Sequence, residues 1–120
     1  MLQTGFEVFT DSQKEELMQE LIAADRVKDC SLNFNGNHVM QQIVIQMGHA
    51  THSSSMCTIV STIEQNILAF CLNEFGCRIV QRVFEKCCQT FTQTVGDAVI
   101  RHFDKMERKE YGIFVISALL

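Results

Sequence analysis

The segments NGNHVMQQIV (35–44) and FGCRIVQRVF (75–84) align without a gap, so that Gly36 matches Gly76. In each of them the glycine is followed three and four positions later by an apolar pair, then by glutamine, and then by a second apolar pair. The segment YGIFVISALL (111–120) keeps the glycine and the first apolar pair, with serine in place of glutamine. The matched glycines, Gly36, Gly76 and Gly112, are 40 and 36 residues apart. A pattern that returns at intervals of this length predicts repeated structural units and not one closed globule.

The spacing of apolar residues inside each repeat predicts helices. Residues 12–29 begin with the capping-box pattern Ser12-x-x-Glu15, and apolar residues then recur at i and i+4 along one face. Further helices are predicted over residues 36–47, 56–67, 77–87 and 92–105. The last of these helices is expected to turn Phe103 inward. No segment alternates apolar and polar residues over a sustained stretch, so a sheet is not expected.

Together these patterns predict an all-α fold, a helical-repeat solenoid of about three repeats. Single repeats of this kind cannot bury their apolar faces alone, and stacking on neighbouring repeats buries them. The absence of proline from all 120 residues fits a chain built mostly of helices. We divide the chain into the end of a truncated repeat, two complete repeats and a partial, degenerate repeat, at residues 1–10, 11–50, 51–90 and 91–120.

The composition narrows the classes of function. A formal net charge of -4 and a pI near 5.5 argue against a protein that binds nucleic acid through bulk positive charge. A local basic stripe is still present, because Arg78, Arg82 and Lys86 follow one another at i, i+4 and i+8. No run approaches the ~18 consecutive apolar residues of a transmembrane helix, so no membrane partner is expected.

Candidate catalytic and metal-ligating residues do not assemble into a recognisable site. The one metal-like cluster is His49-x-x-His52 followed by Cys57, and it lacks a fourth ligand. The sequence contains no phosphate-binding loop, dinucleotide fingerprint or nucleophile elbow. We therefore expect no metal, no cofactor and no enzymatic activity. The six cysteines are expected to be reduced, most of them as small buried hydrophobic residues.

The residues that follow each glycine carry the functional signal. In the first segment, the residues one, two and five positions after the glycine are Asn37, His38 and Gln41. In the second segment, they are Cys77, Arg78 and Gln81. Positions one and five lie one helical turn apart on one face, where two short polar groups can meet a single base edge. Position two carries a flat imidazole or guanidinium group, which suits stacking between successive bases.

Nearly the whole chain resembles the Pumilio (PUF) family of RNA-binding proteins. The two segments that contain these trios carry the resemblance, together with DSQKEELMQELIAADRVKDC (11–30). The resemblance implies repeats of three short helices, of which the middle one lines a concave RNA face. It also implies that Asn37 and Gln41 face the Watson–Crick edge of uridine, and that His38 stacks on a base.

In the second repeat, the resemblance implies an adenine-reading module. Gln81 would hydrogen-bond the base, Cys77 would contact it weakly, and Arg78 would stack. Because family members bind RNA antiparallel, the implied dinucleotide is 5′-A-U-3′ within a UGUA-type element of single-stranded RNA. The basic stripe on the same helix further suggests a phosphate contact for Arg82.

The chain departs from the family pattern at both ends. Gln3 matches position five of a reading helix whose positions one and two would precede Met1. In the last repeat Phe114 can stack, but Ile113 and Ser117 replace the polar readers. An exposed apolar patch is expected there, formed by Ile113, Val115, Ile116, Leu119 and Leu120.

We expect a sequence-selective single-stranded RNA-binding module that acts in post-transcriptional and translational regulation through mRNA 3′ untranslated regions. By family resemblance, its protein partners would be co-repressors or deadenylases in the cytoplasm. The chain would be a fragment or truncated paralogue that binds weakly on its own. Two alternatives stay open. One is a protein-interaction solenoid with a decayed RNA code, and the other is a nucleolar ribosome-biogenesis relative.

Overall fold

The computed structural model describes residues 10–106 and Val115, and every regular element within these residues is a helix. The helices are α2 (Asp11–Ala23), α3 (Val27–Ser31), α4 (Gly36–Met47), α5 (Ser54–Gln65), α6 (Ile67–Cys71), α7 (Gly76–Lys86), α8 (Gln89–Arg101) and α9 (Phe103–Met106). The predicted all-α fold is confirmed. The predicted helix 36–47 is α4, and α7 begins one residue before the predicted helix 77–87. The predicted helix 56–67 is wrong at both ends, because α5 begins at Ser54 and ends at Gln65, and the separate short helix α6 begins at Ile67.

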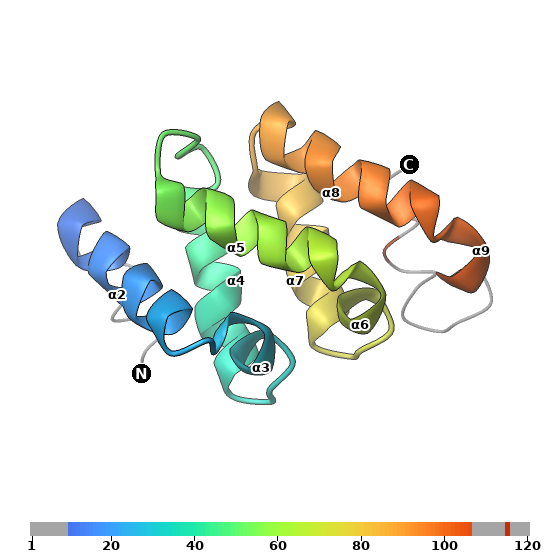
Figure 1. The fold of residues 1–120 in the computed structure, drawn as a ribbon, viewed down its shortest axis with the longest axis horizontal. Helices are drawn as coiled ribbons and strands as arrows, with labels where there is room; N and C mark the ends of the chain where they lie inside the picture. Colours follow the sequence, from blue (N-terminus) through green and yellow to red (C-terminus); the bar gives the residue numbers. More distant parts are fainter. Residues whose placement is uncertain (1–9, 107–114, 116–120) are drawn as a thin grey trace.

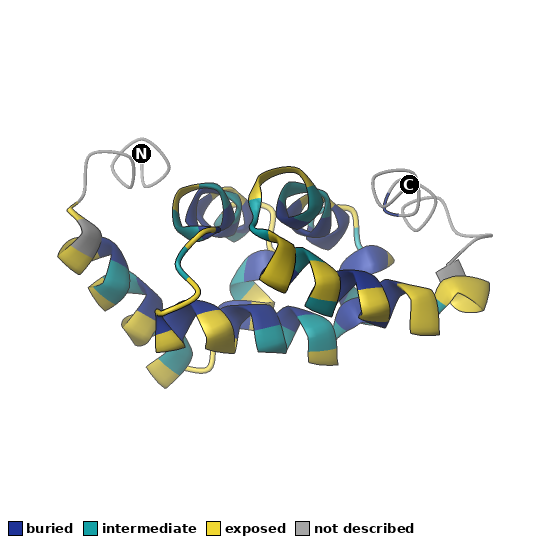
Figure 2. Cartoon of the chain, turned by 90° about the horizontal axis from the view of Figure 1, so that it is seen from above, coloured by how far each residue is buried: buried dark blue, intermediate teal, exposed yellow. Residues whose placement is uncertain are grey.

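The helices form two layers (Figures 1 and 2). We call α2, α5 and α8 the outer layer, in which α5 packs against both of its neighbours. We call α4 and α7 the inner layer, where they form the most extensive helix pair of the described structure. The short helices α3 and α6 join the layers at one end (Figure 1). Two successive units of three helices, α2–α3–α4 and α5–α6–α7, therefore stack side by side.

The core lies between the two layers and runs continuously from one repeat to the next. Its fully buried side chains come from every long helix, and include Met18, Met40, Ile43, Met56, Ile59, Ile63, Phe70, Ile79, Val80, Val95 and Val99. Burying one such side chain stabilises the fold by about 1.5–3 kcal/mol. Since the same positions recur in both repeats, the recurring apolar pattern is the pattern of this shared core.

The repeated glycine stands where two helices of one unit come into backbone contact. A Cβ added at Gly36 would lie 2.6 Å from the carbonyl oxygen of Cys30, and one at Gly76 would lie 2.6 Å from that of Phe70. Both oxygens belong to the short helix that precedes the inner helix, α3 or α6. The glycine lets the short helix approach the first turn of the inner helix, which explains why it recurs at this place.

An asparagine three positions before each glycine starts the inner helix. The Oδ1 atom of Asn33 accepts the backbone N–H groups of Asn35 and Gly36, at 2.8 and 3.0 Å. In the second repeat, Oδ1 of Asn73 accepts those of Phe75 and Gly76, at 2.7 and 2.9 Å. These bonds satisfy amide groups that have no partner inside the helix.

The predicted helix 12–29 is two helices. Helix α2 ends at Ala23, the chain turns through Asp25 with a φ of 54°, and α3 begins at Val27. The predicted capping box Ser12-x-x-Glu15 is also wrong.

The capping box lies two positions earlier. The Thr10 hydroxyl accepts the Gln13 N–H at 3.2 Å, and Gln13 Oε1 accepts the Thr10 N–H at 2.9 Å. Glu15 instead accepts the Ser53 hydroxyl at 2.6 Å. This contact with the next repeat is a use of Glu15 that local spacing does not reveal.

Two expectations near the C-terminus are corrected. The predicted helix 92–105 breaks at His102 into α8 and α9, and Phe103 is 40% exposed because the break takes it off the buried face of α8. The predicted exposed patch includes Val115, but this residue is fully buried as part of the core. The other residues of that patch lie outside the described residues. The repeat boundaries stay a prediction, with residue 50 in the α4–α5 loop and residue 90 in the first turn of α8.

Replacing Gly76 with alanine should destabilise the chain, because the new Cβ would meet the backbone of α6 and force the two helices apart. We expect a loss of about 1–3 kcal/mol in the free energy of unfolding, measured by urea denaturation. Gln93→Ala, at an exposed site in α8, is the matched control and should change stability little. A Gly76→Ala variant as stable as the control would contradict this account of the glycine.

Candidate nucleic-acid interface

The two predicted recognition trios lie on neighbouring helices. Asn37, His38 and Gln41 come from the first two turns of α4, and their counterparts Cys77, Arg78 and Gln81 come from those of α7. Because α4 and α7 pack side by side, residues that lie a whole repeat apart in the sequence form one surface across the repeat boundary. The structure therefore brings together both complete trios.

The three positions of each trio differ in exposure. His38 and Arg78, at position two, are exposed, and Gln41 and Gln81, at position five, are half-buried. Asn37 and Cys77, at position one, are 0% and 2% exposed. The predicted stacking groups thus face solvent, whereas the position-one groups are covered. A direct base contact by Asn37 or Cys77 stays a prediction.

The amide of Asn37 is fully engaged inside the protein. Its Nδ2 donates to the carbonyl oxygens of Asn33 and Phe34, at 2.9 and 2.7 Å. Its Oδ1 accepts a hydrogen bond from Gln41 Nε2 at 2.9 Å. Asn37 therefore anchors Gln41 to the start of α4. In the second repeat, burial raises the pKa of the Cys77 thiol, and the neighbouring Gln81 amide acts against this larger effect by lowering it.

Arg82 links the two inner helices. Its Nε–H donates to Gln41 Oε1 at 3.4 Å, across the boundary between α7 and α4. Its guanidinium group also forms an ion pair with Glu85, one turn further along α7. Arg82 thus contacts a predicted base-reading residue of the preceding repeat, a contact that the basic stripe alone did not reveal.

Arg78 is held from two sides on the surface of α7. Its guanidinium carbon lies 5.8 Å from the centre of the Phe75 ring, within the range of a cation–π contact. Its Nη2 lies 3.8 Å from Glu74 Oε1 in an ion pair between exposed side chains. The Phe75 ring in turn meets Phe34, which is 69% exposed, in an edge-to-face contact with a 5.7 Å centroid separation.

Acidic partners therefore balance both arginines of the predicted basic stripe. Glu74 precedes Arg78 by four positions, and Glu85 follows Arg82 by three, spacings that place side chains on one helical face. These glutamates and Phe75 are the surface residues that sequence reasoning missed. The i,i+3 and i,i+4 spacing of opposite charges was the available signal for the glutamates.

The cysteines and histidines do not form a metal centre within residues 10–106 and Val115, where no group of three or more potential ligands gathers. All six cysteines are free thiols. Burial raises the pKa of Cys71 and of Cys87 to about 12, so both stay protonated at neutral pH. Burial also raises the pKa of the Cys77 thiol, which donates to the carbonyl oxygen of Glu74 at 3.2 Å.

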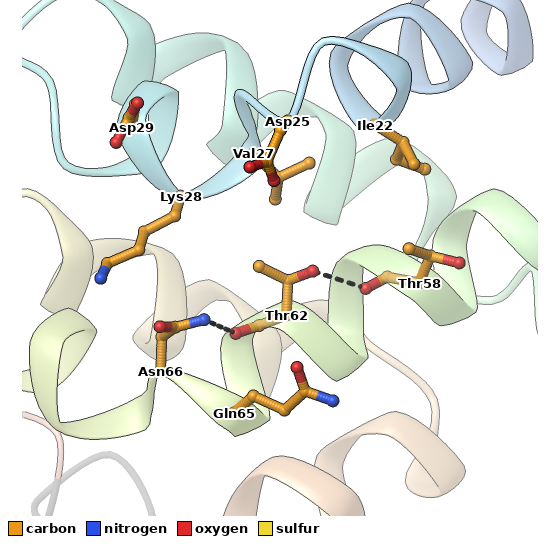
Figure 3. Close-up of a pocket in the computed structure, with 9 residues that line it drawn as sticks. All are labelled: Ile22, Asp25, Val27, Lys28, Asp29, Thr58, Thr62, Gln65 and Asn66. Atoms are coloured by element: carbon orange, nitrogen blue, oxygen red, sulfur yellow. Dashed lines mark hydrogen bonds between the residues drawn. The ribbon is translucent and has the colours of Figure 1, made fainter.

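A cavity of about 360 Å³ has no trio residue in its lining. It lies between the end of α2 and helix α3 on one side and α5 on the other (Figure 3), and is lined by Ile22, Asp25, Val27, Lys28, Asp29, Thr58, Thr62, Gln65 and Asn66. Two of its polar side chains donate hydrogen bonds to backbone carbonyl groups of α5. The Thr62 hydroxyl donates to the Thr58 carbonyl, and Asn66 Nδ2 donates to the Thr62 carbonyl, each at 2.9 Å. No lining residue comes from α4 or α7.

Two predicted site residues, Gln3 and Phe114, lie outside the described residues. Among the helices that are described, none has the length and apolar character needed to cross a membrane.

Comparisons with known proteins agree with this geometry. A model of the Pumilio-family RNA binding repeat matches residues 1–22 and 66–100. The putative pumilio homolog 13 of Arabidopsis thaliana is 26% identical over 115 residues, which are 96% of this chain and 21% of that protein.

Solved structures match over almost the whole chain. The crystal structure of PUF-8 in complex with PBE-RNA has a TM-score of 0.81 at 23% identity, over 98% of this chain and 33% of that one. The Puf4 RNA binding domain bound to the HO endonuclease RNA 3′ UTR recognition sequence has a TM-score of 0.84 at 21% identity, over 98% and 35%. The predicted Pumilio-type solenoid is confirmed as the fold, and the chain spans about a third of these solved arrays.

The raised pKa values of Cys71 and Cys87 predict that these two thiols are alkylated more slowly than the exposed thiol of Cys57. Because Cys71 and Cys87 are protonated at pH 8, they should react with iodoacetamide much more slowly in the folded chain than exposed Cys57 does. Peptide mass spectrometry after timed quenching measures the three rates. In urea, where burial is lost, the rates should converge. Equal rates in the folded chain would contradict the burial of these two thiols.

Proposed function

We propose that the chain, whose repeats are similar to those of the Pumilio family, binds single-stranded RNA along the surface formed by α4 and α7. The observation that carries the proposal is the shared surface of the two trios, with exposed His38 and Arg78 one repeat apart. Imidazole and guanidinium planes at this spacing suit alternate stacking with bases. Half-buried Gln41 and Gln81 lie beside them and supply amides for reading a base edge. This is a binding module and not an enzyme.

We further propose that the RNA is an mRNA 3′ untranslated region and that the outcome is post-transcriptional or translational regulation. The support is the family resemblance, together with a solved relative bound to a 3′ UTR recognition sequence. The sequence read by the two complete trios would be 5′-A-U-3′ within a UGUA-type element. Co-repressors or deadenylases would be the protein partners, in the cytoplasm.

The number of complete trios limits the affinity. Stacking on one base contributes about 1–3 kcal/mol, and two stacking groups are available in the described structure. A dissociation constant of 1 mM already corresponds to about 4 kcal/mol, and association itself costs free energy. The isolated chain should therefore bind RNA weakly, and further repeats in the same array would strengthen binding.

Replacing the stacking groups tests the proposal. His38→Ala and Arg78→Ala should each weaken binding to a UGUAUAUA oligonucleotide about fivefold to a hundredfold, because each removes one base–side-chain stack. Fluorescence polarisation at high protein concentration measures the affinity. Gln65→Ala, in the outer-layer cavity, is the matched control and should bind like the unmodified chain. If all three variants bind alike, RNA does not lie on α4 and α7.

A second candidate is a protein-interaction solenoid whose RNA code has decayed. Two observations favour it. Glu74 and Glu85 offset the arginines on the surface, and both donors of the Asn37 amide are used internally. The net charge of -4 points the same way.

The double variant Gln41→Ala with Gln81→Ala separates the two candidates. If the chain reads RNA, this variant should lose ultraviolet crosslinking to RNA, because both base-edge readers are removed. If the chain is a protein-interaction solenoid, the variant should keep its protein partners in a pull-down and show no change in any residual crosslinking. The circular dichroism spectrum of the variant checks that its fold is intact.

A further inference from the structure

A directed series of hydrogen bonds crosses the boundary between the two repeats. Arg82 Nε–H donates to Gln41 Oε1, Gln41 Nε2 donates to Asn37 Oδ1, and Asn37 Nδ2 donates to two backbone carbonyls. One end of the series is a guanidinium group, which can only donate. The other end consists of carbonyl oxygens, which can only accept.

These ends fix the orientation of both amides. If the Gln41 amide were flipped so that its oxygen and nitrogen exchanged places, its NH₂ group would face the N–H of Arg82. Its oxygen would then face the oxygen of Asn37. Asn37 cannot turn to compensate, because its NH₂ group is held by the carbonyls of Asn33 and Phe34. Without Arg82, only the bond to Asn37 would favour one orientation of Gln41.

We propose that Arg82 is a positioning residue that orients the Gln41 amide across the repeat boundary and thereby sets the base preference of the first repeat. The inference rests on the proposed function, since it assigns a specificity role within the same RNA surface. It differs from the phosphate contact expected for Arg82, because an orienting contact changes which base is bound and not only how tightly RNA is held.

The orientation matters because bases differ in the order of their donors and acceptors. Uracil presents an N–H donor at N3 and an acceptor at C4, and cytosine presents an acceptor at N3 and an amino donor at C4. Gln41 Nε2 keeps one N–H and Oε1 keeps one lone pair beyond the internal bonds. An amide held at both ends distinguishes these two edges, whereas an amide held by Asn37 alone gives up only that one bond when it turns over to match the other edge.

Glu85 completes the arrangement by holding the guanidinium group of Arg82. The ion pair is on the surface of α7, with the Arg82 side chain 30% exposed, and it leaves Nε–H directed at α4. The second repeat offers an internal comparison. The residue equivalent to Arg82 in the following repeat is Ala118, which has no side-chain donor. Base preference opposite Gln81 should therefore not depend on such a contact.

The test uses Arg82→Lys and Arg82→Ala in the full chain, with Lys86→Ala as the matched control for loss of a cation from the same helix. Polarisation assays measure affinity for four oligonucleotides that differ only at the base opposite Gln41, and for four that differ only at the base opposite Gln81. Each series is run at two salt concentrations. Thermal unfolding checks that the variants fold.

We expect Arg82→Ala to reduce the ratio between the best and worst base opposite Gln41 at least fivefold, and to leave the ratio opposite Gln81 unchanged. Lysine keeps the charge and offers N–H donors from Nζ, but it lacks the planar Nε–H group, so Arg82→Lys should keep the phosphate attraction and only part of the base preference. Lys86→Ala should lower affinity for all oligonucleotides equally.

Two outcomes would overturn the inference. If Arg82→Ala keeps full base selectivity, or weakens all oligonucleotides equally with a shallower salt dependence, Arg82 is only a phosphate contact. If the unmodified chain binds none of the oligonucleotides at millimolar concentration, the proposed function fails, and this inference fails with it.

Discussion

The contact between a short helix and the glycine that opens the next inner helix is the constraint on which the rest of the structure depends. In both described repeats the glycine has no room for a Cβ, because a backbone carbonyl would lie 2.6 Å from it. This contact sets where α4 and α7 begin. It therefore also sets which residues occupy the first exposed turn, and the trios occur at a constant distance from the glycine for this reason.

The proposed RNA-binding surface on α4 and α7 depends on both repeats at once. His38 and Arg78 belong to separate units, and they share a surface because the apolar faces of α4 and α7 pack against each other. The contact of Arg82 with Gln41 adds a polar link over the same boundary. A single repeat would have neither the buried core nor the complete set of polar contacts, which is the general behaviour of stacked repeats.

Sequence reasoning succeeded where information is local and periodic. The helical spacing, the recurrence of Gly36 as Gly76 and the extent of the predicted helix 36–47 all have counterparts in the structure. It failed where the partner is distant or the chain changes direction. Glu15 caps no helix because α2 begins earlier than predicted, at the Thr10 cap, and its carboxylate instead accepts the Ser53 hydroxyl of the next repeat. Helix α2 also ends earlier than predicted, where the chain turns at Asp25.

The sequence by itself determined the all-α class, the repeat and the placement of both trios on helices, because apolar periodicity and glycine spacing are properties of the chain alone. Only the tertiary structure decided which trio residues are accessible. Asn37 and Cys77 are buried, and Gln41 is held between Asn37 and Arg82. Accessibility and hydrogen bonding depend on atoms of the neighbouring helix and loop. Their approach is fixed by the packing of the whole stack and not by the residues at the site.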